Sequence, residues 1–364
     1  MKTYSQLQTL TALLLSGALL AIMFSSYSCA GRPPSDPYCS YEPLPASADI
    51  KAGQGALQVE GVTSAYFYVF NEMGNQINYQ SLSKTLGLDP GKYQLKVNNS
   101  SHPITVQKGT LTKCSTGTLM VSGGTAEYYY VVDSANQQLH YDSLGKAASF
   151  LPATFRVKVN NTEVQAELKL NQTTEIKTGT LIVRGNTNEY YYVNDSLGKQ
   201  LNYSSLEKPL AFLPGSYTIR VNNTESKANI VAGQITELKT GTLLVKGSTE
   251  EYYYVLDTLG KQLGYQSLNK ALNLFAGSYR VRVNNSDTTA EVVGGEVRER
   301  ETGSLTVAGN GSEYYYVLDK TGNQLNYNSL NKALSFFPSG YTVKLGQNTQ
   351  PATVTAGQAT SVRF

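Results

Sequence analysis

The sequence lacks tryptophan and has only two histidines and three cysteines among its 364 residues. These few residues show no metal-ligand spacing, so we expect no metal site and no cofactor. Charged residues make up only 16% of the chain, with 30 basic and 27 acidic side chains and no basic cluster. Because a nucleic-acid-binding groove needs clustered lysine and arginine, we also expect no nucleic-acid partner.

The N-terminus lacks an apolar run long enough to span a membrane. Residues 11–24 form an apolar stretch of about 14 residues, short of the roughly 20 that a spanning helix needs. A basic residue before it and small residues after it make residues 1–28 typical of an export signal peptide. The run Ser25-Ser26-Tyr27-Ser28-Cys29 resembles a bacterial lipobox. That resemblance implies lipidation of Cys29 and anchoring in the bacterial cell envelope, at the outer membrane or cell surface. Ordinary cleavage after Ala30 is the alternative.

Residues 29–54 are rich in proline, with five prolines between Pro33 and Pro45. This composition favours an extended, semi-rigid tether without a core. The other two cysteines are Cys39 in the tether and Cys114. A Cys39–Cys114 disulfide is one hypothesis for an oxidising compartment. A buried strand residue at position 114 is the alternative, because the next two copies of this segment have Ile176 and Leu238 there.

The sequence is dominated by repetition. From Gly55 onward one unit of 62 residues recurs five times without insertion or linker. The repeats cover residues 55–116, 117–178, 179–240, 241–302 and 303–364. A fixed period of this length indicates a tandem array. A unit this small buries little surface alone, so we expect neighbouring repeats to support one another through stiff joints.

The third repeat shows the strands that this pattern predicts. Apolar alternation marks strands at Leu181/Val183 and at Tyr217/Ile219/Val221, and an aromatic run marks another at 190–193. The pair Asn222-Asn223, matched in the other repeats, predicts a two-residue hairpin turn. N-glycosylation of the Asn-x-Ser/Thr sequons is the alternative. About six short strands per repeat predict an all-β chain of five small β-sandwiches forming an elongated rod.

A family resemblance rests on short motifs in each repeat. The pattern Gly-Thr-Leu-x-Val, a Tyr-Val-x-Asp strand and the run Leu213-Pro214-Gly215-Ser216-Tyr217 resemble PEGA-type and carboxypeptidase-regulatory-like β-sandwich domains. The resemblance covers residues 55–364 and implies extracytoplasmic, non-catalytic modules. The tyrosine after each such turn is predicted to form a tyrosine corner, with its hydroxyl bonded to backbone upstream. These tyrosines are Tyr93, Tyr217, Tyr279 and Tyr341.

Two recurring patterns resemble motifs that carry out catalysis or covalent cross-linking. Ser-x-x-Lys recurs in every repeat and Lys-Thr-Gly in two junctions, as in penicillin-binding serine enzymes. The Ser-Asp-Asn element of those enzymes is missing, and Pro209 directly follows one of the lysines, so we expect no enzyme. The glutamates at positions 127, 189, 251 and 313 suggest a second hypothesis, a Lys–Asn cross-link beside an acid. Ala65 stands at their position in the first repeat.

The tyrosine runs are the candidate binding residues. Alternation within Tyr128-Tyr129-Tyr130-Val131 predicts that Tyr129 is buried and that its two neighbours are exposed. The residues expected to be exposed are Tyr128, Tyr130, Tyr190, Tyr192, Tyr252, Tyr254, Tyr314 and Tyr316. Recurrent exposed aromatics mark binding surfaces, although packing on neighbouring side chains is the alternative. We therefore expect a non-catalytic, envelope-anchored stalk or spacer with a role in adhesion, or a module that binds glycan or protein.

Overall fold

The computed structural model describes residues 36–46 and 49–364. The chain divides into two units, Met1–Pro37 and Tyr38–Phe364, and every strand of the described part lies in the second. The predicted signal segment and Cys29 fall outside the described residues. Within the described ranges, no helix is long and apolar enough to cross a membrane.

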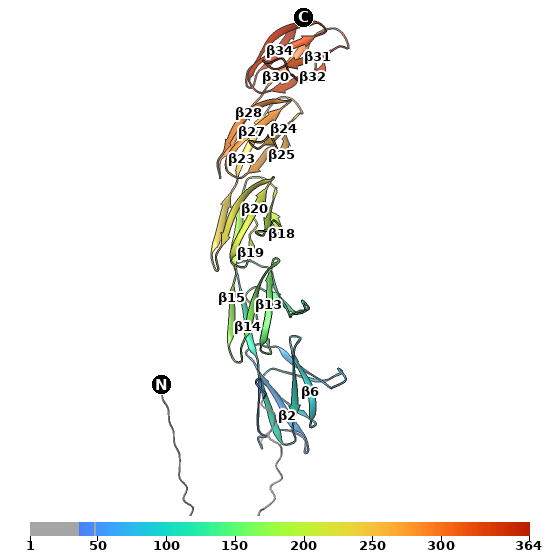
Figure 1. Cartoon of the computed structure of the whole chain (residues 1–364), viewed down its shortest axis with the longest axis vertical. Coiled ribbons are helices and arrows are strands. Elements are labelled where there is room, and N and C mark those ends of the chain that lie inside the picture. Colours follow the sequence, from blue (N-terminus) through green and yellow to red (C-terminus); the bar gives the residue numbers. More distant parts are fainter. Residues whose placement is uncertain (1–35, 47–48) are drawn as a thin grey trace, which may run out of the picture. The chain divides into compact units, whose positions relative to one another are not determined.

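The all-β tandem fold predicted from the sequence is confirmed, with seven strands per repeat instead of about six. Each repeat occupies its own stretch of the colour scale in Figure 1. In the second repeat the strands are β9 (Gly117–Ser122), β10 (Tyr128–Val132), β11 (Gln138–Ser143), β12 (Ala147–Phe150), β13 (Ala153–Val159), β14 (Thr162–Leu168) and β15 (Thr173–Lys177).

The other repeats repeat this strand order. The first has β2 (Gly55–Glu60), β3 (Tyr66–Phe70), β4 (Gln76–Ser81), β5 (Thr85–Leu88), β6 (Gly91–Val97), β7 (Ser100–Val106) and β8 (Thr110–Ser115). The third has β16 (Gly179–Arg184), β17 (Tyr190–Asn194), β18 (Gln200–Ser205), β19 (Leu210–Phe212), β20 (Gly215–Val221), β21 (Thr224–Ile230) and β22 (Ile235–Lys239). The fourth has β23 (Gly241–Lys246), β24 (Tyr252–Leu256), β25 (Gln262–Ser267), β26 (Ala271–Leu274), β27 (Gly277–Val283), β28 (Ser286–Val292) and β29 (Val297–Glu301). The fifth has β30 (Gly303–Ala308), β31 (Tyr314–Leu318), β32 (Gln324–Ser329), β33 (Leu334–Phe336), β34 (Ser339–Leu345), β35 (Asn348–Val354) and β36 (Ala359–Arg363).

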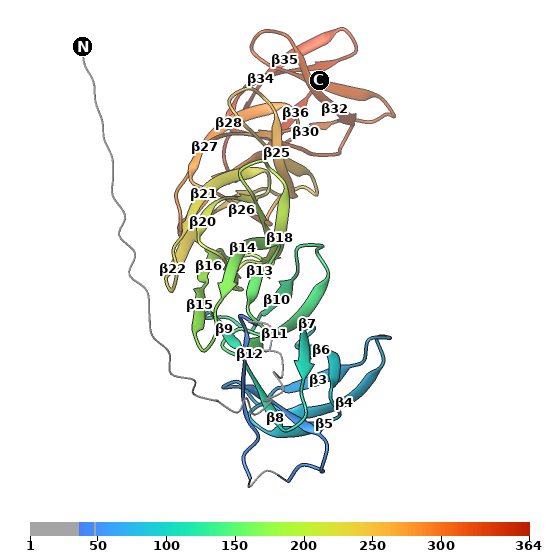
Figure 2. The same ribbon diagram turned by 60° about the horizontal axis from the view of Figure 1, so that its bottom comes forward.

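Each repeat is a sandwich of two sheets. In the second repeat, β9 lies between antiparallel β12 and parallel β15, while β11, β10, β13 and β14 form an antiparallel sheet in that order. Figure 2 shows the matching strands β3, β4 and β6 side by side in the first repeat. Alternating residues of both sheets, such as Leu119, Tyr129 and Val157, meet in one core. Burying these apolar side chains is the main stabilisation of each small unit.

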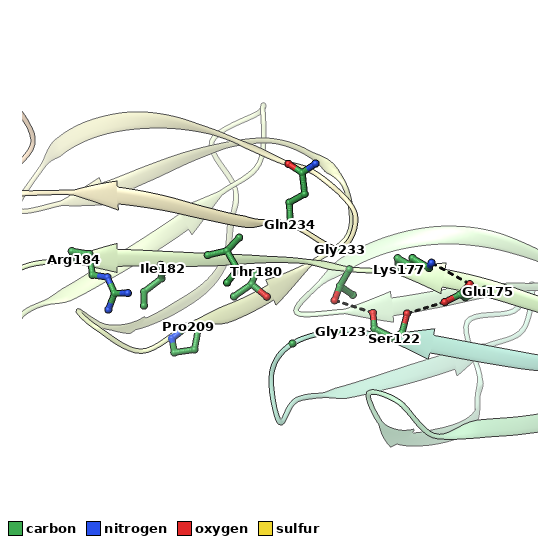
Figure 3. Close-up of a pocket in the computed structure, with 13 residues that line it drawn as sticks. Ser122, Gly123, Glu175, Lys177, Thr180, Ile182, Arg184, Pro209, Gly233 and Gln234 are labelled. Atoms are coloured by element: carbon green, nitrogen blue, oxygen red, sulfur yellow. Dashed lines mark hydrogen bonds and ion pairs between the residues drawn. The ribbon is translucent and has the colours of Figure 1, made fainter.

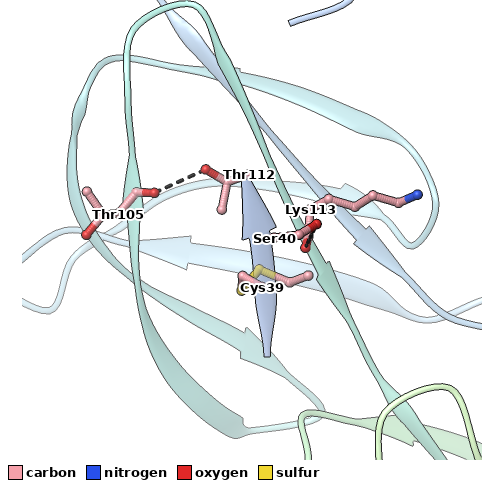
Figure 4. Close-up of a disulfide and its surroundings, with 6 residues drawn as sticks. Cys39, Ser40, Thr105, Thr112 and Lys113 are labelled. Carbon is pink, nitrogen blue, oxygen red and sulfur yellow. Dashed lines mark hydrogen bonds between the residues drawn. A yellow bond between two sulfur atoms is a disulfide. The ribbon is translucent and has the colours of Figure 1, made fainter. Parts of the chain in front are cut away.

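The predicted tether at 29–54 is wrong in part, because residues Cys39–Pro43 form strand β1. This strand pairs antiparallel with β8, and a disulfide joins Cys39 to Cys114 (Figure 4). Both cysteines are buried in the first core. The proline that suggested a spacer, Pro43, sits at the end of an edge strand, where a missing N–H is tolerated.

The glycine that opens each repeat has a steric cause. A Cβ atom on Gly179 would lie 2.3 Å from the carbonyl oxygen of Val231, closer than Cβ atoms approach other heavy atoms in proteins. The same clash would occur at the opening glycines of the other repeats, with backbone oxygens of Gln107, Lys169, Val293 and Thr355. The recurring glycine therefore reports close packing of the first residue of a repeat against the backbone just before the last strand of the same repeat.

The predicted turns and corners are confirmed. Asn222 and Asn223 both have positive φ, at 46° and 57°, as do the matching pairs in the first, second and fourth repeats. The hydroxyl of Tyr217 donates to the carbonyl of Leu213 at 2.6 Å, and burial raises the pKa of this phenol. The other three predicted tyrosine corners make the same bond, at Tyr93, Tyr279 and Tyr341.

Candidate functional site

Three tyrosines gather on the outer face of each four-stranded sheet. In the second repeat, Tyr128 and Tyr130 of β10 are 49% and 40% exposed, while Tyr129 between them is fully buried. Tyr141 of β11 lies opposite Tyr130, and its ring centroid is 6.1 Å from both exposed rings of β10. We call such a group of three rings a tyrosine cluster. Its rings support one another while their outer edges face solvent.

A tyrosine cluster occurs in all five repeats with nearly constant geometry. Every central ring lies 5.7–6.1 Å from its two partners. The clusters are Tyr66/Tyr79/Tyr68, Tyr128/Tyr141/Tyr130, Tyr190/Tyr203/Tyr192, Tyr252/Tyr265/Tyr254 and Tyr314/Tyr327/Tyr316. The predicted exposure is confirmed for six of the eight candidate tyrosines, and Tyr192 and Tyr316 are half-buried. Their role in binding stays a prediction.

Sequence reasoning missed the central ring of each cluster. Tyr79, Tyr141, Tyr203, Tyr265 and Tyr327 lie outside the tyrosine runs, on the next strand. Their recurrence at the 62-residue spacing was the available signal. Only the strand pairing shows that they sit directly opposite the second exposed tyrosine of each run.

A basic residue flanks every tyrosine cluster. The strand on the other side of each tyrosine run places a lysine or arginine opposite its second exposed tyrosine. These residues are Lys96, Lys158, Arg220, Arg282 and Lys344. The Arg220 guanidinium lies over the Tyr192 ring at 5.3 Å, an attraction between a cation and the negative face of the ring. In the fourth repeat Arg282 also donates two hydrogen bonds to Asp287.

Beside one tyrosine cluster the junction between repeats forms a cleft. A cavity of about 390 Å³ is lined by Tyr252, Tyr254 and Arg282, together with Glu250, Glu251, Asn284 and Asn285 of the fourth repeat and Asn326 of the fifth. Aromatic faces and planar polar side chains therefore meet at a place that needs two repeats. The cleft belongs to the junction as much as to the tyrosine cluster.

The asparagine pair at each hairpin tip ties its repeat to the next one. The amide of Asn222 donates to the Asn273 carbonyl at 3.0 Å, and that of Asn223 donates to the Leu263 carbonyl at 2.9 Å. The same two bonds occur at the other three junctions. N-glycosylation would replace one hydrogen of the first asparagine's amide with a bulky sugar where that amide contacts the next repeat, which argues against glycosylation there.

An apolar side chain of each following repeat completes the core before it. Phe275 of the fourth repeat packs in the core of the third, and its backbone N–H donates to the Thr224 hydroxyl at 3.0 Å. Leu151, Leu213 and Phe337 occupy the same place at the other junctions. In the first repeat this position is Asp89. Neighbouring repeats therefore share apolar cores in addition to hydrogen bonds.

A glutamate adds a further link at three of the four junctions. The Glu189 carboxylate accepts from the Asn222 amide at 2.7 Å and from the backbone N–H of Asn273 at 3.0 Å. Glu127 and Glu251 contact their asparagines and the next repeat in the same way. The glutamates considered as cross-linking acids therefore serve the junctions. Glu313 is exposed, and the asparagine position of its repeat is Gly346.

A larger cavity of about 610 Å³ lies between the second and third repeats on the three-stranded sheets. Figure 3 shows Ser122, Glu175 and Lys177 on one side, and Thr180, Ile182, Arg184 and Pro209 on the other. A matching but smaller cavity of about 280 Å³ follows the first repeat. Both open where one repeat passes directly into the next.

The remaining chemical candidates resolve into structural roles. Ser-x-x-Lys forms a turn in each repeat, with the lysine N–H bonded to the serine carbonyl, so it does not open a helix as the serine-enzyme motif requires. In four repeats the buried core tyrosine donates its hydroxyl to that lysine's carbonyl.

No protein family and no curated protein matches this sequence. Among solved structures, the chain is similar to the TIE protein of Bacillus anthracis, at 13% identity over 73% of this chain and 75% of that one, with a TM-score of 0.16. It is also similar to BcpA, the major pilin subunit of Bacillus cereus, at 11% identity over 86% and 99% of the two chains (TM-score 0.17). The pilus adhesin SpaC of Lactobacillus rhamnosus GG matches at 9% identity over 85% and 43% (TM-score 0.16). Similarities this low carry no argument about function.

Proposed function

We propose that this chain is a non-catalytic stalk, anchored by a lipid at Cys29 in the bacterial cell envelope and displaying its repeats at the surface. The observation that carries the proposal is the junction, which uses the same asparagine bonds and the same shared core at all four joints. In the described ranges, the hydrogen bonds that join two repeats connect neighbours in the chain. Such a pattern supports a stiff, extended array of PEGA-like repeats.

The connection between repeats supports the same proposal. Strand β22 ends at Lys239 and β23 begins at Gly241, which leaves Thr240 alone between them. Its hydroxyl donates to the Arg184 carbonyl at 2.8 Å, and its own carbonyl accepts from the N–H of Gly295 in the next repeat at 2.9 Å. The matching threonines make both bonds at the other junctions. A one-residue linker that is held by hydrogen bonds to both repeats leaves little freedom for a hinge.

The anchor would hold the first repeat close to the membrane. Because β1 begins at Cys39, only nine residues separate it from Cys29. Fully extended, that segment spans at most about 35 Å. The disulfide at Cys39 therefore shortens the free tether and would pass the anchor's load directly into the core of the first repeat.

Cell fractionation and acyl labelling test the anchor. The wild-type protein is expected in the membrane fraction with an acyl label, and Cys29→Ser is expected to lose both. Ser28→Ala is the matched control and should keep them, because a small residue is retained before the cysteine. A soluble, unacylated wild-type protein that begins at Gly31 would contradict the lipid anchor.

A second candidate function is binding by the tyrosine clusters. The observation that favours it is that all five repeats keep three tyrosines and one basic residue on the same outer face. Cross-strand packing alone explains a tyrosine pair, but it does not require rings that remain half exposed in every copy. A stalk that carries such a face can bind along its length.

A further inference from the structure

We propose that the tyrosine clusters bind a polysaccharide, with one short segment of the polymer on each repeat, and that the junction cleft beside the cluster of the fourth repeat holds part of that polymer. This inference rests on the second candidate function and names its ligand class. Three features carry it: the chemistry of the cluster, the composition of the cleft beside the cluster of the fourth repeat, and the regular recurrence of the clusters along the chain.

The chemistry of the cluster suits a pyranose ring. One face of a sugar ring presents C–H groups that pack on an aromatic face, while its hydroxyls need hydrogen-bond partners at the rim. Tyrosine supplies both parts, a flat apolar ring and a hydroxyl that donates and accepts. In the fourth repeat, Tyr252 and Tyr265 are about half exposed, so their rings remain open to a ligand.

The cleft adds the partners that sugar hydroxyls need. Around Tyr252 and Tyr254 stand a carboxylate at Glu250, a guanidinium at Arg282 and the amide of Asn326 from the next repeat. The carboxylate accepts hydrogen bonds, the guanidinium donates them and the amide does both. A site with few polar groups around aromatic faces is typical of a small-molecule pocket. At about 390 Å³, the cleft has room for one or two sugar units.

The recurrence distinguishes a polymer from a single protein partner. Five equivalent clusters along one chain match a ligand that repeats. When several clusters hold the same polymer molecule, overall binding can exceed that of one cluster by a factor of about 10²–10⁴. A protein partner needs a continuous patch of about 800 Å² on each side. Here a basic side chain borders the rings on one side in every repeat. In the described part of the chain, the most exposed leucines are Leu197 and Leu259, in the turns that follow β17 and β24.

Affinity electrophoresis of the whole mature chain tests this proposal. The gels contain laminarin, dextran, polygalacturonate or hyaluronate, which sample neutral and acidic polymers. The main variant changes every central tyrosine to threonine: Tyr79→Thr, Tyr141→Thr, Tyr203→Thr, Tyr265→Thr and Tyr327→Thr. The matched control combines Leu197→Ser with Leu259→Ser, which removes exposed apolar area outside the clusters. Circular dichroism and thermal melting check the fold of each protein.

At least one polymer should retard the wild type and the leucine control, and the affinity of the five-site variant should be at least about 100-fold lower. A trisaccharide from the same polymer should bind the wild type about 100-fold more weakly than the polymer does. If the five-site variant melts early, Tyr265→Thr alone, which leaves four clusters intact, should still weaken binding several-fold. If added salt and Arg220→Ala both weaken binding, the polymer is acidic. If binding does not depend on salt, the polymer is neutral. Both outcomes support the proposal.

Retardation by none of the four polymers, or equal retardation of the five-site variant, would overturn the polysaccharide proposal. Tyrosine-dependent self-association, or tyrosine-dependent adhesion of cells that no polysaccharide competes, would also overturn it. These last two outcomes would leave binding by the tyrosine clusters standing. The anchored stalk has its own tests and does not depend on this result.

Discussion

Removing the glutamate link from one junction should loosen that junction and leave the others intact. In Glu189→Ala, the amide of Asn222 and the backbone N–H of Asn273 both lose a carboxylate acceptor. Hydrogen bonds to charged groups contribute about 1.5–3 kcal/mol each, and water can replace part of this loss at a half-buried site. The expected loss of coupling between the third and fourth repeats is therefore about 2 kcal/mol.

Hydrogen exchange at the Phe275 amide measures this loss. That N–H keeps its own acceptor, the Thr224 hydroxyl, in the variant, so it exchanges faster only if the junction opens. A loss of about 2 kcal/mol corresponds to roughly 30-fold faster exchange. The N–H of Asn273 is a poorer probe, because it loses its acceptor directly.

The chain provides a matched control and a reciprocal test. Glu313→Ala removes the same side chain from an exposed position whose asparagine partner is Gly346, so exchange at Phe275 and Phe337 should stay unchanged. Ala65→Glu adds the missing acceptor where Asn98 already bonds to Ser149, so exchange at the Leu151 amide should slow. Unchanged exchange at Phe275 in Glu189→Ala, or equal effects of Glu189→Ala and Glu313→Ala, would refute the junction role of these glutamates.

Three further predictions concern the corner, the disulfide and a turn. Tyr217→Phe should lower the free energy of unfolding by about 1 kcal/mol, measured by urea denaturation, because it removes the buried hydrogen bond to Leu213. Phe155→Tyr in the second repeat is the reciprocal variant. Unchanged stability in Tyr217→Phe would show that this tyrosine acts only through packing. Cys39→Ser should destabilise the first repeat by about 2–5 kcal/mol and release β1, seen as rapid exchange at residues 39–43, whereas Ser40→Ala should leave β1 paired with β8. Hydrogen bonds from the Thr321 hydroxyl and from Asn323 hold the pKa of Asp319 at about 2, below its unfolded value. The turn should therefore keep this stabilisation above about pH 4 and lose it as pH falls through 2. An Asp319 titration midpoint near pH 4, measured by NMR, would contradict this.

The strands, turns and corners were predictable because they follow from local rules. Period-2 alternation placed Tyr129 in the core and its two neighbours outside, and a pair such as Asn222-Asn223 required positive φ. The opening glycines marked the repeat but not their own cause, which is a close contact with the backbone just after the sixth strand of the same repeat. Local pattern therefore predicted which residues recur and what conformation they adopt.

The contacts between repeats were not predictable, because periodicity does not show what a recurring residue touches. Glu189 was a candidate cross-linking acid, but its carboxylate accepts hydrogen bonds at the junction. The turn asparagines were assigned to the turns alone, although their amides also bond to the next repeat. Tyr141 was overlooked because it lies on a different strand from the tyrosine run. Strand β1 was missed because the proline-rich composition outweighed the buried Cys39 and its partly buried neighbour Tyr38.

The central claim is that junctions built on the same asparagine bonds and shared cores make a stiff, extended stalk, and small-angle X-ray scattering of the mature chain tests it most directly. A compact 62-residue unit has a diameter of about 27 Å, so five units end to end predict a maximum dimension of about 135 Å. Deleting residues 179–240 removes one repeat but leaves matched junction residues on both sides, and should shorten this dimension by about 27 Å. A maximum dimension well below about 100 Å, or no shortening in the deletion, would show that the repeats fold back on one another and would contradict the stalk.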